Sequence, residues 1–265
     1  MSKAARIKAA RRQAPPPIGK NQPLAPRSIW LATAVGAAVI AIVVTVLLVI
    51  RPTPQAPRAG TPSAADLNAP TGLVRAAARV GFQPNVEPGV GQIENKPADA
   101  AQAPSSPDLL PVRTTAPPFT LKTPEGGIVG LGDLRGKAVL IEFFATWCPH
   151  CAAEAPHLER LYRSLPQRDV AFVSINGDGE DSASVYAYHR YFGLGFPALL
   201  DPSSRPGSFT SPGAGGATSQ AYGVESFPTF YVLDRSGRIT WRSDGEQPDA
   251  LLRGQLERAA AANGA

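Results

Sequence analysis

The sequence contains very little sulfur and imidazole, since its 265 residues include two cysteines, one methionine and three histidines. With two cysteines the chain can form one internal disulfide at most, which excludes the multi-disulfide framework of small secreted domains. A structural zinc site needs four ligands, and the three histidines are not spaced as a second ligand pair. The two thiols are therefore expected to react with each other or with a partner.

Acidic residues are missing from the first 58 positions, which carry nine Lys and Arg residues. The rest of the chain holds 17 basic and 21 acidic residues, so its net charge is −4 although the whole chain carries +5. Binding of nucleic acid by a basic domain is therefore not expected. We interpret residues 1–28 as a basic tail that lies beside anionic lipid head groups.

An uncharged segment, Ile29–Ile50, follows the basic tail. Its 22 residues would form a helix of about 33 Å, enough to cross the hydrocarbon layer of a membrane. The basic flank predicts a cytoplasmic N-terminus and an extracytoplasmic catalytic domain. The run is longer than the apolar core of a cleavable signal peptide, which favours an uncleaved, single-pass anchor in the cell membrane.

Residues 51–108 are rich in Pro, Ala, Gly and Ser and contain few aromatic residues. Such a stretch cannot bury enough apolar surface to offset the entropy lost on ordering. We expect a mostly disordered, flexible linker between the membrane and the folded domain. Leu73–Phe82 is the exception, because it could form a short helix or a docking segment.

Residues 109–265 are long enough to form one folded domain. Strand and helix patterns alternate along this stretch until a final hairpin, which predicts an α/β fold with a mixed central β-sheet flanked by helices. The expected strands are Pro117–Leu121, Gly127–Val129, Ala138–Ala145, Val170–Asn176, Ala198–Leu200, Thr229–Leu233 and Arg238–Arg242. The expected helices are Pro149–Leu165, Asp181–Phe192, Ser219–Tyr222 and Pro248–Ala261.

The two cysteines lie in Trp147-Cys148-Pro149-His150-Cys151, directly after the apolar run Ala138–Ala145. A Cys-x-x-Cys at a strand-to-helix junction can close and reopen a small disulfide. An inert structural disulfide is the alternative, but a bond that closes so short a loop adds little stability. We therefore expect a redox-active Cys148–Cys151 disulfide.

The two thiols should have different tasks. Pro149 is a favoured first helical residue, so Cys148 should lie at the helix N-terminus, where free N–H groups and the helix dipole stabilise a thiolate. Cys148 is therefore the expected nucleophile. Cys151 lies one turn further in and should resolve the mixed disulfide.

Other motifs accompany the cysteines: Ala116-Pro117-Pro118-Phe119-Thr120-Leu121, Leu134-Arg135-Gly136-Lys137, Phe143-Phe144-Ala145-Thr146-Trp147-Cys148 and Tyr222-Gly223-Val224-Glu225-Ser226-Phe227-Pro228-Thr229. With the order of the elements, they resemble the thioredoxin-like fold. Within that fold, the chain resembles the membrane-anchored TlpA/ResA-type thiol–disulfide oxidoreductases, which are related to the AhpC/TSA proteins. The resemblance covers about residues 116–242.

This resemblance implies an enzyme that reduces disulfides of exported proteins. The haem-site thiols of apocytochrome c are the family's best-known substrate. A membrane electron donor or acceptor would be the redox partner. No cofactor is implied, because the disulfide itself carries the two electrons.

Two carboxylates are candidates for proton handling. Glu142 shares a strand face with Leu140 and Phe144, and the resemblance implies that it is the buried acid that moves protons for the resolving thiol. Burial would raise its pKa. Glu154 follows Cys151 by three residues on the same helical face, and the resemblance implies that it tunes the cysteines. The alternatives are a strand-end Glu142 that reaches solvent and a solvated Glu154 on the helix surface.

Pro228 matches the family's cis-proline that faces the disulfide, and Phe227 would offer backbone groups to an extended substrate segment. Trp147 would form a flat wall of the substrate surface. The Pro149-His150 dipeptide also occurs in strongly oxidising DsbA-like proteins, where a cationic histidine favours the reduced form. We favour a reductase, because the whole domain resembles the reductants. His157 and His189 are expected at helix surfaces.

Three other functions stay open. A disulfide-donating, DsbA-like oxidase is indicated by His150. A thiol peroxidase shares the core fold, although no separate peroxidatic cysteine exists. A copper-binding module could use the two thiolates and His150. The Gly/Ser/Pro-rich insertion at 203–216 is expected to be a surface loop.

Overall fold

The computed structural model describes residues 69–85, 87, 90–91, 106–202 and 215–262. All of them belong to the unit Pro57–Ala265, whereas the unit Met1–Ala56 lies outside the described residues. No helix within these described ranges is long and apolar enough to span a membrane. The predicted basic tail, the predicted span Ile29–Ile50 and positions 203–214 of the insertion lie outside them.

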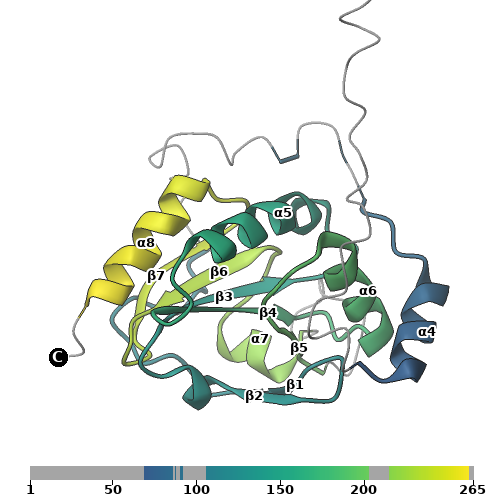
Figure 1. Ribbon diagram of the computed structural model, residues 1–265. Coiled ribbons are helices and arrows are strands. Elements are labelled where there is room, and N and C mark those ends of the chain that lie inside the picture. The colour runs from purple at the N-terminus through teal and green to yellow at the C-terminus, as the bar shows by residue number, and fades with distance from the viewer. Residues whose placement is uncertain (1–68, 86, 88–89, 92–105, 203–214, 263–265) are drawn as a thin grey trace, which may run out of the picture. The chain divides into compact units, whose positions relative to one another are not determined.

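A seven-stranded mixed sheet forms the centre of the domain, with the strand order β2-β1-β5-β4-β3-β6-β7 (Figure 1). Strands β3, β4 and β5 are parallel, whereas β1, β2, β6 and β7 pair antiparallel with their neighbours. The strands are β1 (Thr120–Lys122), β2 (Ile128–Gly130), β3 (Ala138–Phe144), β4 (Val170–Asn176), β5 (Ala198–Leu200), β6 (Thr229–Leu233) and β7 (Ile239–Asp244). All seven residues of β3 are buried, as expected for a central strand covered on both faces.

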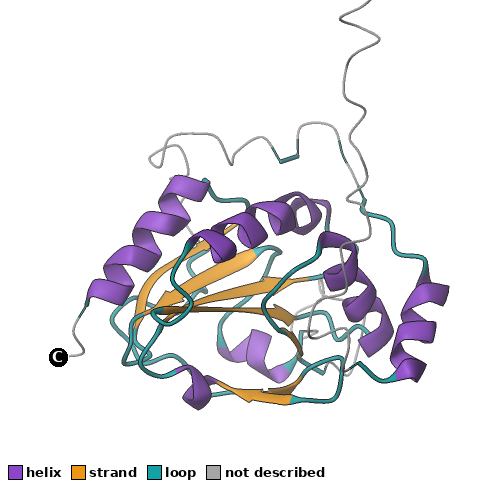
Figure 2. Cartoon of the chain, viewed as in Figure 1, coloured by secondary structure: helices purple, strands orange, loops and turns teal. Residues whose placement is uncertain are grey.

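Helices cover the two faces of this sheet unequally (Figure 2). The longer helices α5 (Pro149–Ser164), α6 (Ser182–Phe192) and α8 (Asp249–Ala261) pack on one face. On that face Leu140 of β3 packs with Leu158 of α5 and Leu252 of α8. The short helix α7 (Ala217–Ala221) and the 3₁₀ turn Leu131–Leu134 lie toward the other face. Because side chains alternate along β3, the strand contributes to both cores.

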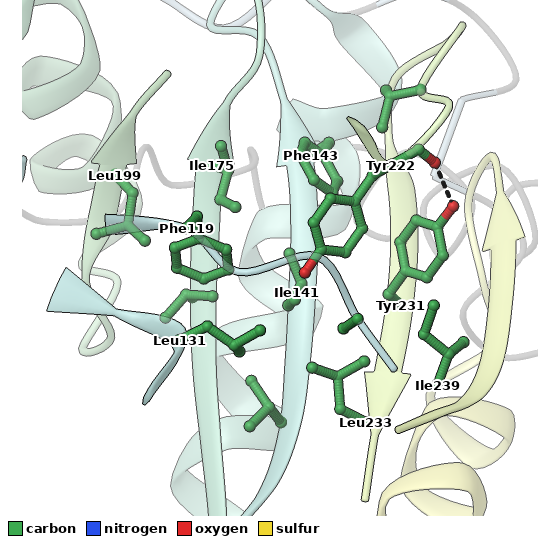
Figure 3. Close-up of a cluster of buried hydrophobic side chains, with 14 of the residues drawn as sticks. Phe119, Leu131, Ile141, Phe143, Ile175, Leu199, Tyr222, Tyr231, Leu233 and Ile239 are labelled. Carbon is green, nitrogen blue, oxygen red and sulfur yellow. Dashed lines mark hydrogen bonds between the residues drawn. The ribbon is translucent and has the colours of Figure 1, made fainter. Parts of the chain in front are cut away.

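Two tyrosines connect the chain segment before β1 to the sheet. Tyr222, directly after α7, and Tyr231 of β6 pack edge to face with ring centroids 5.1 Å apart. The Tyr231 hydroxyl donates to the Tyr222 carbonyl oxygen (Figure 3). It also accepts from the Leu110 N–H at 3.0 Å. Both hydroxyls have protein partners, since Tyr222 donates to the Pro117 carbonyl at 2.9 Å. The core can therefore bury these polar atoms without an unmet hydrogen bond.

Part of the segment expected to be a flexible linker is ordered. Helix α4 spans Thr71–Val80 and ends at Gly81, which has a left-handed backbone. Phe82 then inserts its ring among Tyr188, Tyr191 and Phe192 of α6, with centroid distances of 5.3 to 6.0 Å. Both possibilities left open for Leu73–Phe82, a short helix and a docking segment, are present, because α4 forms and packs against α6. Burial of Leu73, Ala77 and Phe82 explains why this stretch departs from the linker prediction.

The expected strands and helices of the domain are present: β4, β5 and β6 have the expected bounds, and the ends of the other elements are shifted by at most three residues. One expectation about a side chain was wrong. His189 was expected at a helix surface, but it is buried against Phe144 and Phe196. Burial lowers the pKa of His189 to about 3, so the ring is neutral. His157 is half-buried on α5.

We expect Phe82→Ala to release α4 from α6, because it removes three aromatic ring contacts, worth on the order of 1–3 kcal/mol together. Amide hydrogen exchange should become faster in residues 71–82 and stay unchanged in β3. Val80→Ala is the matched control, since Val80 is an exposed residue of the same segment. Equal exchange in Phe82→Ala and the unsubstituted protein would contradict the anchoring role.

Candidate functional site

Both cysteines lie where β3 passes into α5. Cys148 is the N-cap of α5, with an extended backbone, and Pro149 is the first helical residue. The Cys148 sulfur accepts a hydrogen bond from the Cys151 N–H at 3.3 Å. Both residues are buried, and no bond joins their two sulfur atoms. This is the helix-terminal placement that the sequence predicts.

The pKa values of the two thiols are shifted in opposite directions. The pKa of Cys148 lies below its usual value, because the Cys151 thiol and the backbone N–H groups of Cys151 and His150 stabilise the thiolate. Burial raises the pKa of Cys151 well above its usual value, and the nearby Cys148 and Glu142 raise it further. Cys148 therefore ionises first and can attack, whereas Cys151 stays protonated until a base removes its proton.

The Phe227–Pro228 loop faces the Cys148 sulfur. The peptide bond between these residues is cis, as the resemblance implied. The Cys148 thiol donates to the Phe227 carbonyl oxygen at 3.5 Å. The Trp147 ring, 48% exposed, packs edge to face against the Phe227 ring with centroids 6.2 Å apart. The two rings and the loop thus form a surface next to the reactive sulfur.

Gly177 allows this loop to approach the sheet. A Cβ atom at Gly177 would lie 2.9 Å from the Phe227 ring and 2.7 Å from the Ser219 hydroxyl, closer than packed atoms can come. Only glycine therefore fits beneath the Phe227 ring.

Glu142 is buried in the middle of the central sheet, so the alternative of a solvated strand end is wrong. The Ser174 hydroxyl, opposite it on β4, donates to Oε2. Among the described residues no group forms a hydrogen bond to Oε1. Burial raises the pKa of Glu142 to about 7, and the Ser174 hydrogen bond offsets part of this effect. A carboxyl with this pKa can both take up and release a proton near neutral pH.

Glu154 is also buried, although it lies on a helix, so the solvated alternative is wrong here too. Desolvation raises its pKa well above the usual value, and the charges of Glu142, Glu246 and Asp249 raise it further. The backbone N–H of Gln247 acts in the opposite direction. Several acidic groups share this buried region of the cysteine helix, and together with burial they favour the protonated form of Glu154.

His150 is the exposed residue between the cysteines, and its ring contacts the loop between β7 and α8. Its Nδ1 lies 2.6 Å from Oε1 of Glu246. No group of three or more His, Cys, Asp or Glu side chains in the described part of the chain is arranged to hold a metal ion.

Sequence reasoning missed a polar cluster that holds the loop before Cys148. The Trp147 indole N–H donates to Asp178 at 2.7 Å, and the Thr146 N–H donates to Glu180 at 2.7 Å. Asn176 also donates to Glu180 at 2.7 Å. The run Asn176-Gly177-Asp178-Gly179-Glu180 at the end of β4 could have indicated this cluster. Because β3 and β4 are parallel neighbours, they end at the same edge of the sheet, so polar residues after β4 lie near the loop that follows β3.

This chain is similar in sequence to one protein family and to several known thiol-disulfide oxidoreductases. The family model described as the AhpC/TSA family matches residues 112–242. A thiol-disulfide oxidoreductase ResA of Bacillus thuringiensis (strain Al Hakam) is 31% identical over 151 residues, covering 57% of this chain and 80% of the relative. A ResA of Bacillus subtilis (strain 168) is 27% identical over 137 residues, covering 52% of this chain and 69% of the relative.

A solved structure of a thioredoxin-like superfamily protein has the same fold. It is 22% identical, with a TM-score of 0.50, and the match covers 57% of this chain and 99% of that chain. The thioredoxin-like fold with a mixed sheet and flanking helices is therefore confirmed for the described domain.

We expect Glu142→Gln to flatten the pH dependence of stability. The folded pKa of Glu142 is about 7 and the ordinary value is 4.5, so the folded protein keeps a proton that the unfolded chain loses. This contribution to the free energy of unfolding is complete below pH 4.5 and is lost as the pH rises through 7. It amounts to about 3 kcal/mol.

Denaturant titrations of the reduced proteins at pH 5 and pH 8 measure this effect. Glu257→Gln on the exposed side of α8 is the matched control and should keep the pH dependence of the unsubstituted protein. The same pH dependence in Glu142→Gln would mean that Glu142 is ionised in the folded state.

Proposed function

The chain belongs to the family of ResA-type thiol–disulfide oxidoreductases, and we propose that it reduces disulfides of exported proteins while anchored to a membrane. The unequal acidity of the two cysteines is the observation that supports this proposal most directly. The pKa of Cys148 is lowered, as suits an attacking thiol, and the pKa of Cys151, buried one turn behind it, is raised. This pair can receive and pass on one disulfide at a time.

In the reducing direction, the Cys148 thiolate attacks one sulfur of a substrate disulfide. A bond forms between Cys148 and that sulfur, and the other substrate sulfur leaves as a thiolate. Cys151 then gives its proton to a base and attacks the Cys148 sulfur, which releases the second substrate thiolate. Two electrons pass to the substrate, and a Cys148–Cys151 disulfide remains. A dithiol donor in the membrane has to return the two electrons.

Glu142 is the base that suits the second step. With a pKa of about 7 it is partly ionised near neutral pH, and its charge acts on both cysteines. The proton that leaves Cys151 can pass to Glu142 and then to the departing substrate thiolate. Glu154, buried on α5 three residues after Cys151, is the second acid of this region, and we propose that it tunes the exchange.

The substrate would lie on the surface formed by Trp147, Phe227 and Pro228. An extended segment could pair with the backbone of the Phe227–Pro228 loop without reading a particular sequence. When its disulfide approaches Cys148, the thiol hydrogen bond to the Phe227 carbonyl is exchanged for the contact with substrate. Such a surface suits a reductase with several thiol-bearing partners.

The segment Ile29–Ile50 and its basic flank support the proposed location. They would place the N-terminus in the cytoplasm and the domain from residue 109 onward outside it. The haem-site thiols of apocytochrome c are the substrate that we propose to test first, because each site carries a Cys-x-x-Cys that must be reduced before haem is attached.

The reduction potential of the Cys148–Cys151 couple in the full-length protein decides the direction of exchange. We expect a value near that of thioredoxin, roughly −270 mV, after equilibration against glutathione at pH 7. A value near that of DsbA, roughly −120 mV, would contradict the reductase and would favour the disulfide-donating alternative.

We expect Cys151→Ser to trap a mixed disulfide between Cys148 and an oxidised apocytochrome haem-site peptide, because the resolving thiol is absent. Cys148→Ser is the matched control and should trap nothing. Intact mass spectrometry before and after addition of reductant measures the adduct. Rapid peroxide turnover by Cys151→Ser, without any adduct, would instead indicate a thiol peroxidase.

A further inference from the structure

Glu246 lies in the loop between β7 and α8 and contacts the residue between the two cysteines. Its Oε1 atom lies 2.6 Å from Nδ1 of His150. The Glu246 side chain is 9% exposed and the His150 side chain 51% exposed, so the carboxylate is the fixed member of the pair. The imidazole can change its position only by leaving this carboxylate.

Further contacts hold Glu246 and its loop in place. The Gly91 N–H donates to both carboxylate oxygens, at 3.2 and 3.0 Å. Next to Glu246, the Gly245 N–H donates to the Pro228 carbonyl at 2.8 Å, which joins the loop to the cis-proline segment. On the other side, the Gln247 amide donates to the carbonyl of Gly245 at 3.0 Å. The carboxylate is therefore oriented before any substrate binds.

The position of the His150 ring matters for the redox couple. A cation beside a cysteine sulfur stabilises the thiolate, and this favours the dithiol over the disulfide. In this structure the groups that stabilise the Cys148 thiolate are the Cys151 thiol and the backbone N–H groups of Cys151 and His150. The His150 ring is bound to Glu246 instead, so the imidazole lies against a carboxylate.

We propose that Glu246 is a positioning residue that keeps the His150 ring on the β7–α8 loop and thereby lowers the reduction potential of the Cys148–Cys151 couple. The inference rests on the proposed thiol–disulfide exchange and concerns its direction. The half-reaction is the same with or without Glu246: the disulfide takes up two electrons and two protons and becomes two thiols. Only the relative stability of the two forms changes.

The test is Glu246→Gln in the full-length protein. The amide removes the negative charge but keeps an oxygen that can accept from Gly91. We expect the equilibrium with glutathione at pH 7 to shift about tenfold toward the dithiol, which corresponds to a potential about 30 mV higher. Alkylation of Cys148 by iodoacetamide should become faster, because more thiolate is present.

A double-substitution cycle with His150→Gln separates positioning from a direct charge effect. In the His150→Gln background, Glu246→Gln should change the equilibrium less than about twofold, because no imidazole remains to be released. Glu257→Gln removes the same charge from the far part of α8 and should leave the equilibrium unchanged. The far-UV circular dichroism of each variant verifies that it is folded.

Two results would overturn the inference while the proposed function stands. One is an unchanged potential in a folded Glu246→Gln variant, and the other is the same shift in both backgrounds. If the unsubstituted protein did not exchange with glutathione at all, the proposed function itself would be wrong, and the inference would fall with it.

Discussion

The hydrogen bond from the Cys151 N–H to the Cys148 sulfur is the interaction on which the site depends. The first turn of any helix has N–H groups without a partner inside the helix, and a side chain usually accepts from one of them. In α5 that side chain is a thiol, so the group that caps the helix is also the reactive group. The bond becomes stronger when the sulfur is ionised, since charged acceptors bind N–H groups more tightly. The start of α5 therefore stabilises the attacking form of Cys148 without any cofactor.

One turn further along α5, Cys151 has to stay protonated, whereas Cys148 has to ionise. Cys151, Glu142 and Glu154 are all acids that lie in a region nearly closed to water, and Glu142 raises the pKa of both Cys151 and Glu154. A low-dielectric region does not accommodate several negative charges, so the first proton lost makes the next loss harder. Ionisation costs the least free energy at Glu142, because the Ser174 hydroxyl donates a hydrogen bond to its carboxylate. The proton of Cys151 thus has a nearby acceptor, while the thiol itself is kept from ionising in the resting dithiol.

The parts of the site that could be predicted are those set by local sequence. The Cys-x-x-Cys after a buried strand defines the nucleophile, and the period of two along β3 places Glu142 among apolar residues. The cis conformation at Pro228 came from the resemblance alone, because a single sequence contains no signal for it. Asp178, Glu180 and Glu246 were missed because they meet their partners across 31, 34 and 96 residues. The run at the end of β4 indicates the edge of the sheet where Asp178 and Glu180 lie, but the partner that each of these three residues meets depends on how the strands and loops are arranged.

Local sequence also does not specify which helix residues are buried, nor which residues before the domain pack against it. The spacing of Glu154 and His189 places each on a helix, but only the elements packed against those helices decide that both are buried. In the segment before residue 109, composition argues against order, yet α4 is docked on α6 by Leu73, Ala77 and Phe82 although a helix of this length is too short to be stable alone. Phe82 binds α6, and nine residues later Gly91 binds Glu246 beside the cysteine helix. Described residues before position 109 therefore contact the domain. A change in this segment can reach the redox site through Glu246, even though the segment contributes no reactive group.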